Sequence, residues 1–261
     1  KTKPPQESVK ELQGMGIQPD IIVCRSEYPL DNGIKDKIAL FCNVPSSHVL
    51  QNLDVEYLYE APLAMEEEHL AQVACECLGL PCPEPNLSDW KAMCTALKHP
   101  KGEVSVALVG KYTQLHDAYI SVVESLKHGG IANGVSVNIK WVDSEKVTAE
   151  NVEEFLGDVS GIIVPGGFGD RGIEGMIQSI RYAREKKVPF LGLCLGMQLT
   201  IVEFTRDVVG YNDAHSVEFL PGTTHPVIHL MPDQEGIDDI GGTLRLGSYP
   251  CILDESSKAY A

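Results

Sequence analysis

The stretch from Val188 to Gln198, VPFLGLCLGMQ, constrains the fold more than any other part of the chain. Its apolar run at 190–193 predicts a short buried strand, and a helical pattern begins at Gly196. Cys194 falls where the strand meets the helix. Because Gly192 and Gly196 have no Cβ, they permit the sharp turn that such a junction needs. The stretch therefore predicts a strand–turn–helix elbow that carries a thiol at the edge of a sheet.

A thiol in this position has the surroundings of a nucleophile. It precedes a helix N-terminus, whose positive end favours the thiolate form of Cys194. The backbone N–H of Leu195 follows directly and is suited to stabilise an oxyanion. The alternative interpretation is a buried structural cysteine, and this stretch alone does not decide between the two.

A second glycine-rich stretch bears on that choice. Residues 161–172, GIIVPGGFGDRG, also run from an apolar strand into a glycine turn. They contain neither the Gly-Lys-Ser/Thr of a Walker A loop nor the usual glycine spacing of a dinucleotide site. Open α/β sheets place their sites at the carboxyl ends of parallel strands. We therefore expect Gly167 and Cys194 to lie together, with a bare backbone close to a small ligand.

These motifs resemble a known family. PGGFG followed by GLCLGMQ is similar to the class I glutamine amidotransferases, whose nucleophile is the cysteine of G-x-C-x-G. Further blocks, in matching order, resemble the CTP synthase family; they are KTKPPQESVKEL, CRSEYPL, KIALFCNVP, NDAHSVEF and GGTLRLG. The resemblance covers nearly the whole chain. It implies part of a ligase in which a glutaminase releases ammonia from glutamine and an amidoligase uses ATP to convert UTP to CTP.

The resemblance assigns roles within a glutaminase site. Cys194 would form a γ-glutamyl thioester, and the backbone N–H groups of Gly167 and Leu195 would stabilise the oxyanion. Gln198 and Glu218 would hold the α-amino and α-carboxylate groups of glutamine. From the residues alone, a solvated charge beside a strand is the other interpretation of Glu218.

The resemblance also assigns nucleotide sites in the first 80 residues, which contain no P-loop. The residues that would bind UTP or CTP at a subunit interface are Lys1, Lys3, Gln6 and Lys37. Arg25 and the backbone near Val55 would belong to the ATP site. Pro5 stands where the family usually has Thr, so the hydroxyl contact of the family is not expected here, while Lys1, Lys3 and Gln6 are unchanged. A frayed basic terminus is the interpretation that the first residues suggest on their own.

A GTP site is implied less directly. Phe168 and the segment around Leu244 and Arg245 align with the region where GTP activates this family. A phenylalanine in a glycine turn could stack on a base, and it could equally fill a hydrophobic gap. Both interpretations stay open at this point.

A thiol nucleophile needs a base, usually a histidine oriented by a carboxylate. None of the eight histidines is followed two residues later by Glu, the arrangement found in the family, and the nearest case, His225, has Val at that position. In the family this pair lies far beyond the cysteine, and the P-loop and magnesium ligands lie before the segment that matches Lys1. We therefore expect a fragment that lacks these groups, binds no metal through its own ligands and has little or no activity. The parent enzyme would use Mg²⁺ and ATP, with GTP as activator.

The expected elements indicate an α/β fold in two parts. Residues 1–80 would be the end of a P-loop-type α/β amidoligase domain, 81–102 a proline-rich linker, and 103–261 a C-terminally truncated amidotransferase domain with a flavodoxin-like, doubly wound parallel sheet. Expected helices cover 8–15, 34–42, 65–78, 117–128, 152–155 and 172–186. Expected strands cover 19–24, 49–55, 104–110, 136–142 and 161–164, besides the strand at 190–193.

Net charge and cysteine content limit the possible binding partners and the cellular compartment. The net charge of −16 argues against nucleic-acid binding and against docking on anionic membranes. No run of 18 apolar residues predicts a membrane span. Eight scattered cysteines fit reduced thiols in the cytoplasm, and the four at 75, 77, 82 and 94 lack the paired spacing of a zinc site. The resemblance implies a homotetramer in the parent enzyme.

The sequence leaves two alternatives to an amidotransferase that is part of a CTP synthase. The first is an inactive, amidotransferase-like protein that serves in oligomerisation or as a nucleotide-binding regulatory module. The second is a free-standing amidotransferase or hydrolase, against which the N-terminal blocks argue because such a protein has no use for them.

Overall fold

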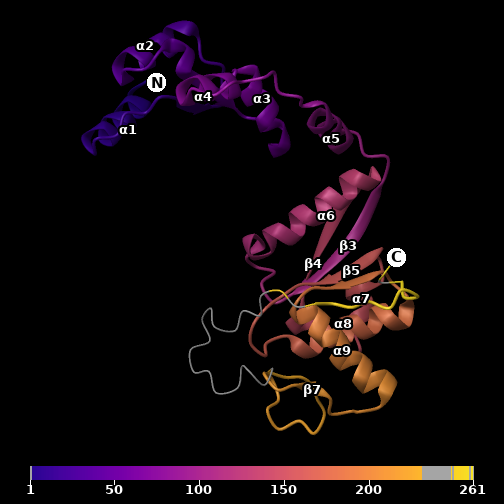
Figure 1. The fold of residues 1–261 in the computed structure, drawn as a ribbon. Helices are drawn as coiled ribbons and strands as arrows, with labels where there is room; N and C mark the ends of the chain where they lie inside the picture. Colours follow the sequence, from indigo (N-terminus) through magenta and orange to yellow (C-terminus); the bar gives the residue numbers. More distant parts are fainter. Residues whose placement is uncertain (1, 231–247, 249, 259, 261) are drawn as a thin grey trace. The chain divides into compact units, whose positions relative to one another are not determined.

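The computed structural model describes residues 2–230, 248, 250–258 and 260. It divides the chain into two compact units (Figure 1). The first comprises Lys1–Glu103 and Lys127–Ser136, and the second Val104–Leu126 and Val137–Ala261. Each unit has its own sheet and its own hydrophobic core, so each is described separately. The domain boundaries expected at 80 and 102 stay predictions.

The first unit is built on a two-stranded parallel sheet. Strand β1 (Ile22–Ser26) pairs with β2 (Val49–Leu53) in a register that places Ile22 opposite Val49. Its helices are α1 (Lys3–Gly14), α2 (Asn32–Cys42), α3 (Ala61–Glu67), α4 (Leu70–Leu78) and α5 (Ser88–Lys98). The core contains Val9, Ile22, Ile38, Ala39, Cys42 and Val49. Helices α1 and α2 therefore pack against the sheet through these apolar side chains.

Helix α1 begins five residues earlier than the sequence suggested. We expected it to start at Ser8, after the Pro4-Pro5 pair, but these prolines lie inside its first turn. The first N–H groups of a helix have no intrahelical partner, so proline costs no hydrogen bond there. The prolines therefore begin the helix and do not precede it.

The helix expected over 65–78 is broken. Helix α3 ends at Glu67 and α4 begins at Leu70, because His69 adopts a left-handed conformation with φ 59°. A non-glycine residue rarely takes this conformation, and no glycine or proline marks the break in the sequence.

The second unit contains a four-stranded sheet in the order β4-β3-β5-β6. Its strands are β3 (Glu103–Gly110), β4 (Ser136–Asp143), β5 (Gly161–Val164) and β6 (Phe190–Gly192). Strand β5 is parallel to both β3 and β6. The helices are α6 (Ile120–Asn133), α7 (Val152–Leu156), α8 (Ile173–Lys186) and α9 (Leu195–Phe204), and α6 follows a short 3-10 turn at His116–Tyr119.

Helices cover both faces of this sheet (Figure 1). Ala107 and Val109 pack in one core cluster with side chains of α8 and α9. Leu108, between them, packs in another cluster with Tyr119 and with Val122 of α6. Because successive residues of a strand face opposite sides of the sheet, α6 lies on the face opposite α8 and α9. The expected α/β architecture with a doubly covered parallel sheet is confirmed.

After α9 the chain forms a π-helical turn (Thr205–Val209) and a small parallel pair, β7 (His215–Ser216) with β8 (Pro226–Ile228). Among the helices described, none is both long enough and apolar enough to cross a membrane.

Candidate functional site

Cys194 occupies the turn between β6 and α9. Its backbone has φ 52° and ψ −106°, a strained conformation for a residue with a side chain. A Cβ added at Gly192 would lie 2.6 Å from backbone atoms of Gly196, and one added at Gly196 would lie 2.1 Å from the carbonyl oxygen of Val164. Both distances are too short for any real Cβ. The elbow therefore requires glycine at both positions, as the sequence predicts.

The thiol faces the glycine turn that follows β5. A Cβ added at Gly166 would lie 3.4 Å from Cys194 Cβ and 3.7 Å from its Sγ. One added at Gly167 would lie 3.6 Å from Leu195 Cδ2. The Cys194 side chain is exposed, which rules out the buried structural cysteine. The structure thus brings Cys194, Gly167 and Leu195 together, and their catalytic roles stay predictions.

Two more of the predicted glutamine-binding residues, Gln198 and Glu218, follow this elbow in the chain. Gln198 is one turn into α9, where its N–H donates to the carbonyl of Cys194 at 3.0 Å, and it is half-buried. Glu218 is exposed just after β7, and its N–H donates to Ser216 Oγ at 3.2 Å.

Lys111 is a site residue that the sequence analysis missed. It directly follows β3 and is only 4% exposed. Its Nζ donates to the carbonyl oxygen of Phe168 at 3.0 Å and also to that of Gly169. Its Cδ lies 3.5 Å from the position of a Cβ at Gly167. A charged residue at the carboxyl end of an apolar strand was the signal that could have found it.

Lys111 and Glu218 interact electrostatically. Burial lowers the pKa of Lys111 from its ordinary value, the charge of Glu218 opposes this shift, and Arg171 adds to it. The carboxylate predicted to bind glutamine therefore lies near the lysine that holds the glycine turn.

Phe168 lies at the tip of the glycine turn, with 84% of its surface exposed. It does not fill a hydrophobic gap, which was one of its two interpretations. Its role in binding GTP stays a prediction. Leu244 and Arg245, the other residues of that prediction, lie outside the described residues.

His225, the histidine nearest to the family's pattern, lacks the Glu two residues later but contacts an aspartate from another loop. Its Nδ1 lies 2.5 Å from Asp213 Oδ1, and its ring stacks on Tyr211. Hydrogen bonds from Thr224 and from His225 hold the pKa of Asp213 far below its ordinary value. The acid comes from an earlier loop and does not follow the histidine in sequence.

The predicted UTP-binding residues lie on two helices that pack together. Lys3 and Gln6 belong to α1, and Lys37 belongs to α2. The buried apolar side chains of these two helices pack in one hydrophobic cluster. Both lysines are exposed. Gln6 Nε2 is buried and has no hydrogen-bond partner among the described residues. Lys1 lies outside them, so its place in this group is not described.

The predicted ATP-binding residues lie at the carboxyl end of the small sheet. Arg25 is opposite Asn52 in the β1–β2 register, and its Nη1 donates to the Asn52 carbonyl at 3.1 Å. Its Nη2 forms an ion pair with Asp54, the residue before Val55. Parallel pairing therefore brings Arg25 and the Val55 segment to the same edge.

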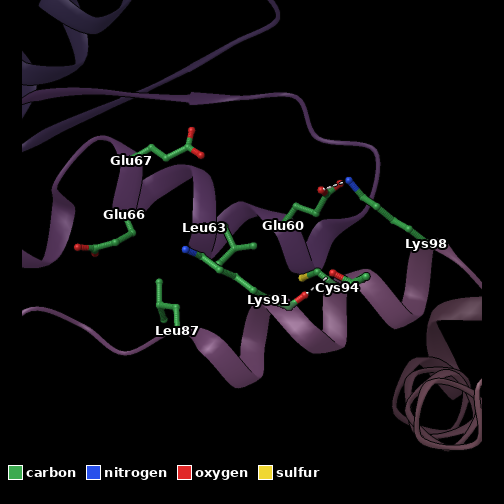
Figure 2. Close-up of a pocket in the computed structure, with 9 residues that line it drawn as sticks. Glu60, Leu63, Glu66, Glu67, Leu87, Lys91, Cys94 and Lys98 are labelled. Carbon is green, nitrogen blue, oxygen red and sulfur yellow. Dashed lines mark hydrogen bonds and ion pairs between the residues drawn. The ribbon is translucent and has the colours of Figure 1, made fainter.

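A separate hollow of about 390 Å³ lies between α3 and α5 (Figure 2). Its lining residues are Glu60, Leu63, Glu66, Glu67, Leu87, Lys91, Cys94, Thr95 and Lys98. Lys98 pairs with Glu60, and the Cys94 thiol donates to the carbonyl of Tyr59 at 3.3 Å. None of the predicted nucleotide-binding residues belongs to this lining, so the hollow is separate from the predicted sites.

Comparison with protein families defines the class. Residues 114–260 match the model of glutamine amidotransferase class-I, and residues 1–80 match that of the CTP synthase N-terminus. The chain therefore belongs to the class-I glutamine amidotransferase family.

The similarity to CTP synthases extends along the whole chain, which confirms the resemblance seen in the sequence. The CTP synthase of Clostridium acetobutylicum is 57% identical over 260 residues, which are 100% of this chain and 49% of that protein. That of Ruminiclostridium cellulolyticum is 57% identical over 257 residues, 98% of this chain and 48% of that protein. The chain thus spans about half the length of the curated relatives it matches.

One solved structure is also similar, the glutaminase domain of Trypanosoma brucei CTPS with bound acivicin. It is 41% identical, covers 50% of this chain and 51% of that chain, and has a TM-score of 0.48.

Proposed function

We propose that this chain is part of a CTP synthase, a ligase that aminates UTP with ammonia taken from glutamine. Its second unit would bind glutamine and attack the side-chain amide with Cys194. The observation that carries this proposal is the exposed Cys194 thiol on a strained elbow, 3.7 Å from the position of a Cβ at Gly166.

The chemistry follows from this arrangement. The Cys194 thiolate, stabilised by the N-terminus of α9, attacks the amide carbon of glutamine. The N–H groups of Gly167 and Leu195 stabilise the negative oxygen of the tetrahedral intermediate. The C–N bond breaks, ammonia leaves with a proton, and a γ-glutamyl thioester remains. Water then cleaves the thioester, so that glutamine and water yield glutamate and ammonia.

The proposal also covers the residues that would bind glutamine and the nucleotides. Gln198 and Glu218 would hold the α-amino and α-carboxylate groups of glutamine. The proposed UTP or CTP contacts are Lys1, Lys3, Gln6 and Lys37. Arg25 and Val55 would contact ATP, and Phe168 would contact the activator GTP. The parent protein would act as a homotetramer in the cytoplasm.

Mg²⁺ would accompany ATP in the parent enzyme. Within the described residues, no three or more His, Cys, Asp or Glu side chains are grouped so that they could hold a metal ion. No step above is assigned to a metal ion.

A chloroketone analogue of glutamine tests the nucleophile. We expect the folded chain to gain one label, at Cys194, and glutamine to slow the reaction. The Cys194→Ser variant should gain none. Cys77→Ser, which removes an exposed cysteine of α4, is the matched control and should label at the wild-type rate. Absence of labelling in a demonstrably folded wild-type chain would refute the proposal.

A further inference from the structure

Every polar group of Lys111 has a partner in the second unit, either Tyr119 or a residue of the stretch 168–171. Its N–H donates to Tyr119 Oη at 3.0 Å, and its carbonyl accepts from Arg171 Nη2 at 3.2 Å. Its ammonium donates to the carbonyls of Phe168 and Gly169. The backbone of Lys111 is thus fixed at both ends while its side chain reaches the glycine turn.

The anchor at Tyr119 is built into the packing. A Cβ added at Gly110 would lie 2.5 Å from Tyr119 Oη, so only glycine leaves room for the phenol. Tyr119 is 4% exposed, and its hydroxyl also accepts from the N–H of Tyr112 at 3.3 Å. A buried hydroxyl with these partners holds the start of the Lys111 segment in one position.

The glycine turn needs a constraint from outside. Three of its four residues, Gly166, Gly167 and Gly169, are glycines, and Gly169 has φ 74°. Glycine populates many backbone conformations, so this turn has little stiffness of its own. Charge-assisted hydrogen bonds are about twice as strong as neutral ones, and rotation of either carbonyl away from Lys111 would lose one.

Stabilisation of an oxyanion depends on donors that are oriented before the reaction. Lys111 does not have to touch the substrate for this purpose, because it bonds the carbonyls of Phe168 and Gly169, the two residues that follow Gly167. Its Cδ and Cε lie 3.5 and 3.7 Å from the position of a Cβ at Gly167, so the side chain also packs against that residue.

We propose that Lys111 is the positioning residue of the oxyanion site, holding the carbonyls of Phe168 and Gly169 so that the Gly167 N–H stays directed at the oxyanion formed on attack by Cys194. This inference rests on the proposed glutaminase function. It adds to that function a buried lysine that acts through the backbone of the turn.

The test compares two reagents on the full chain. With the chloroketone analogue, the thiolate adds to the ketone and forms an oxyanion; the sulfur then displaces chloride, and the thiol proton passes to the buffer. Iodoacetamide alkylates the same thiol by direct displacement of iodide and forms no oxyanion. The maximal rate and the half-saturating concentration are measured for wild type, Lys111→Met and Lys111→Arg.

We expect Lys111→Met to lower the maximal rate with the chloroketone by about 10- to 100-fold, somewhat less than the loss of an oxyanion donor itself. Its half-saturating concentration should stay within about threefold, and the iodoacetamide rate at Cys194 within about twofold, because neither depends on the oxyanion. Lys111→Arg, which keeps the charge and the donors, should recover most of the rate.

The outcomes distinguish failure of the proposed glutaminase function from failure of the positioning role of Lys111. If the wild-type chain is not labelled by the analogue, the proposed function fails. If the wild type is labelled and Lys111→Met reacts at the same rate, only the positioning role fails. An equal loss with iodoacetamide also overturns that role, since it indicates a collapsed elbow. Should Lys111→Met not fold, Lys111→Gln serves as the neutral variant, and a wild-type maximal rate for it overturns the inference.

Discussion

At the scale of single residues, the site depends on two glycine positions where a Cβ atom would overlap neighbouring backbone atoms. Gly192 and Gly196 allow the backbone of Cys194 to take its strained conformation between β6 and α9. The same contacts bring α9 close to the end of β5, because a Cβ at Gly196 would overlap the carbonyl of Val164. The thiol is therefore placed by backbone packing and not by its own contacts.

Gly196→Ala tests that packing. The added methyl group would lie 2.1 Å from the Val164 carbonyl oxygen, which is backbone and cannot move aside cheaply. We expect a loss of about 2–4 kcal/mol of unfolding free energy, measured by urea denaturation. The matched control is Gly129→Ala in α6, where a Cβ would meet nothing within 4 Å. That change should stabilise by about 0.5–1 kcal/mol, and equal effects at both positions would contradict the account.

At the scale of elements, a partly buried ion pair joins helices α8 and α9. Glu203 of α9 is 1% exposed and accepts from Arg184 of α8 through hydrogen bonds of 2.9, 3.2 and 2.7 Å. Bonding to Glu203 raises the pKa of Arg184. Because Cys194 lies at the start of α9, this pair helps to fix the helix that carries the elbow.

Arg184→Met should leave the Glu203 carboxylate buried without its partner. Breaking a buried pair from one side typically costs about 3–5 kcal/mol, and the partial exposure of Arg184 reduces this to roughly 2–4 kcal/mol. Chemical denaturation measures the loss. Arg181→Met, on the same helix, breaks exposed pairs with Glu185 and Asp207 and should cost less than about 1 kcal/mol. A similar cost for both variants would show that the Glu203 contact adds nothing.

The sequence predicts elements well where local signals agree with packing. The apolar runs at 104–110 and 161–164 are strands as expected, since both faces of this sheet are covered. The break at His69 was missed, because a left-handed histidine is uncommon and no glycine or proline marks the position in the sequence. Lys111 was missed because a charged residue is expected to be exposed. Its burial against the glycine turn, 57 residues away in the chain, depends on the tertiary fold.

At the scale of the whole molecule, the chain combines two units with separate cores and separate expected roles. The first carries exposed Lys3 and Lys37 on packed helices, and the second carries the thiol elbow. Similarity to CTP synthases runs through both. The nucleotide assignments come from that resemblance alone, whereas the Cys194 site also follows from strand order and glycine placement. The second unit is therefore where the proposed function is most open to a physical test.

The most direct test is a crystal structure of the chain after reaction with the chloroketone analogue of glutamine. The account predicts a thioether bond from Cys194 Sγ to the ligand, with the ketone oxygen of the adduct about 2.7–3.1 Å from the backbone nitrogens of both Gly167 and Leu195. A covalent adduct whose oxygen points to solvent and contacts neither amide would contradict it.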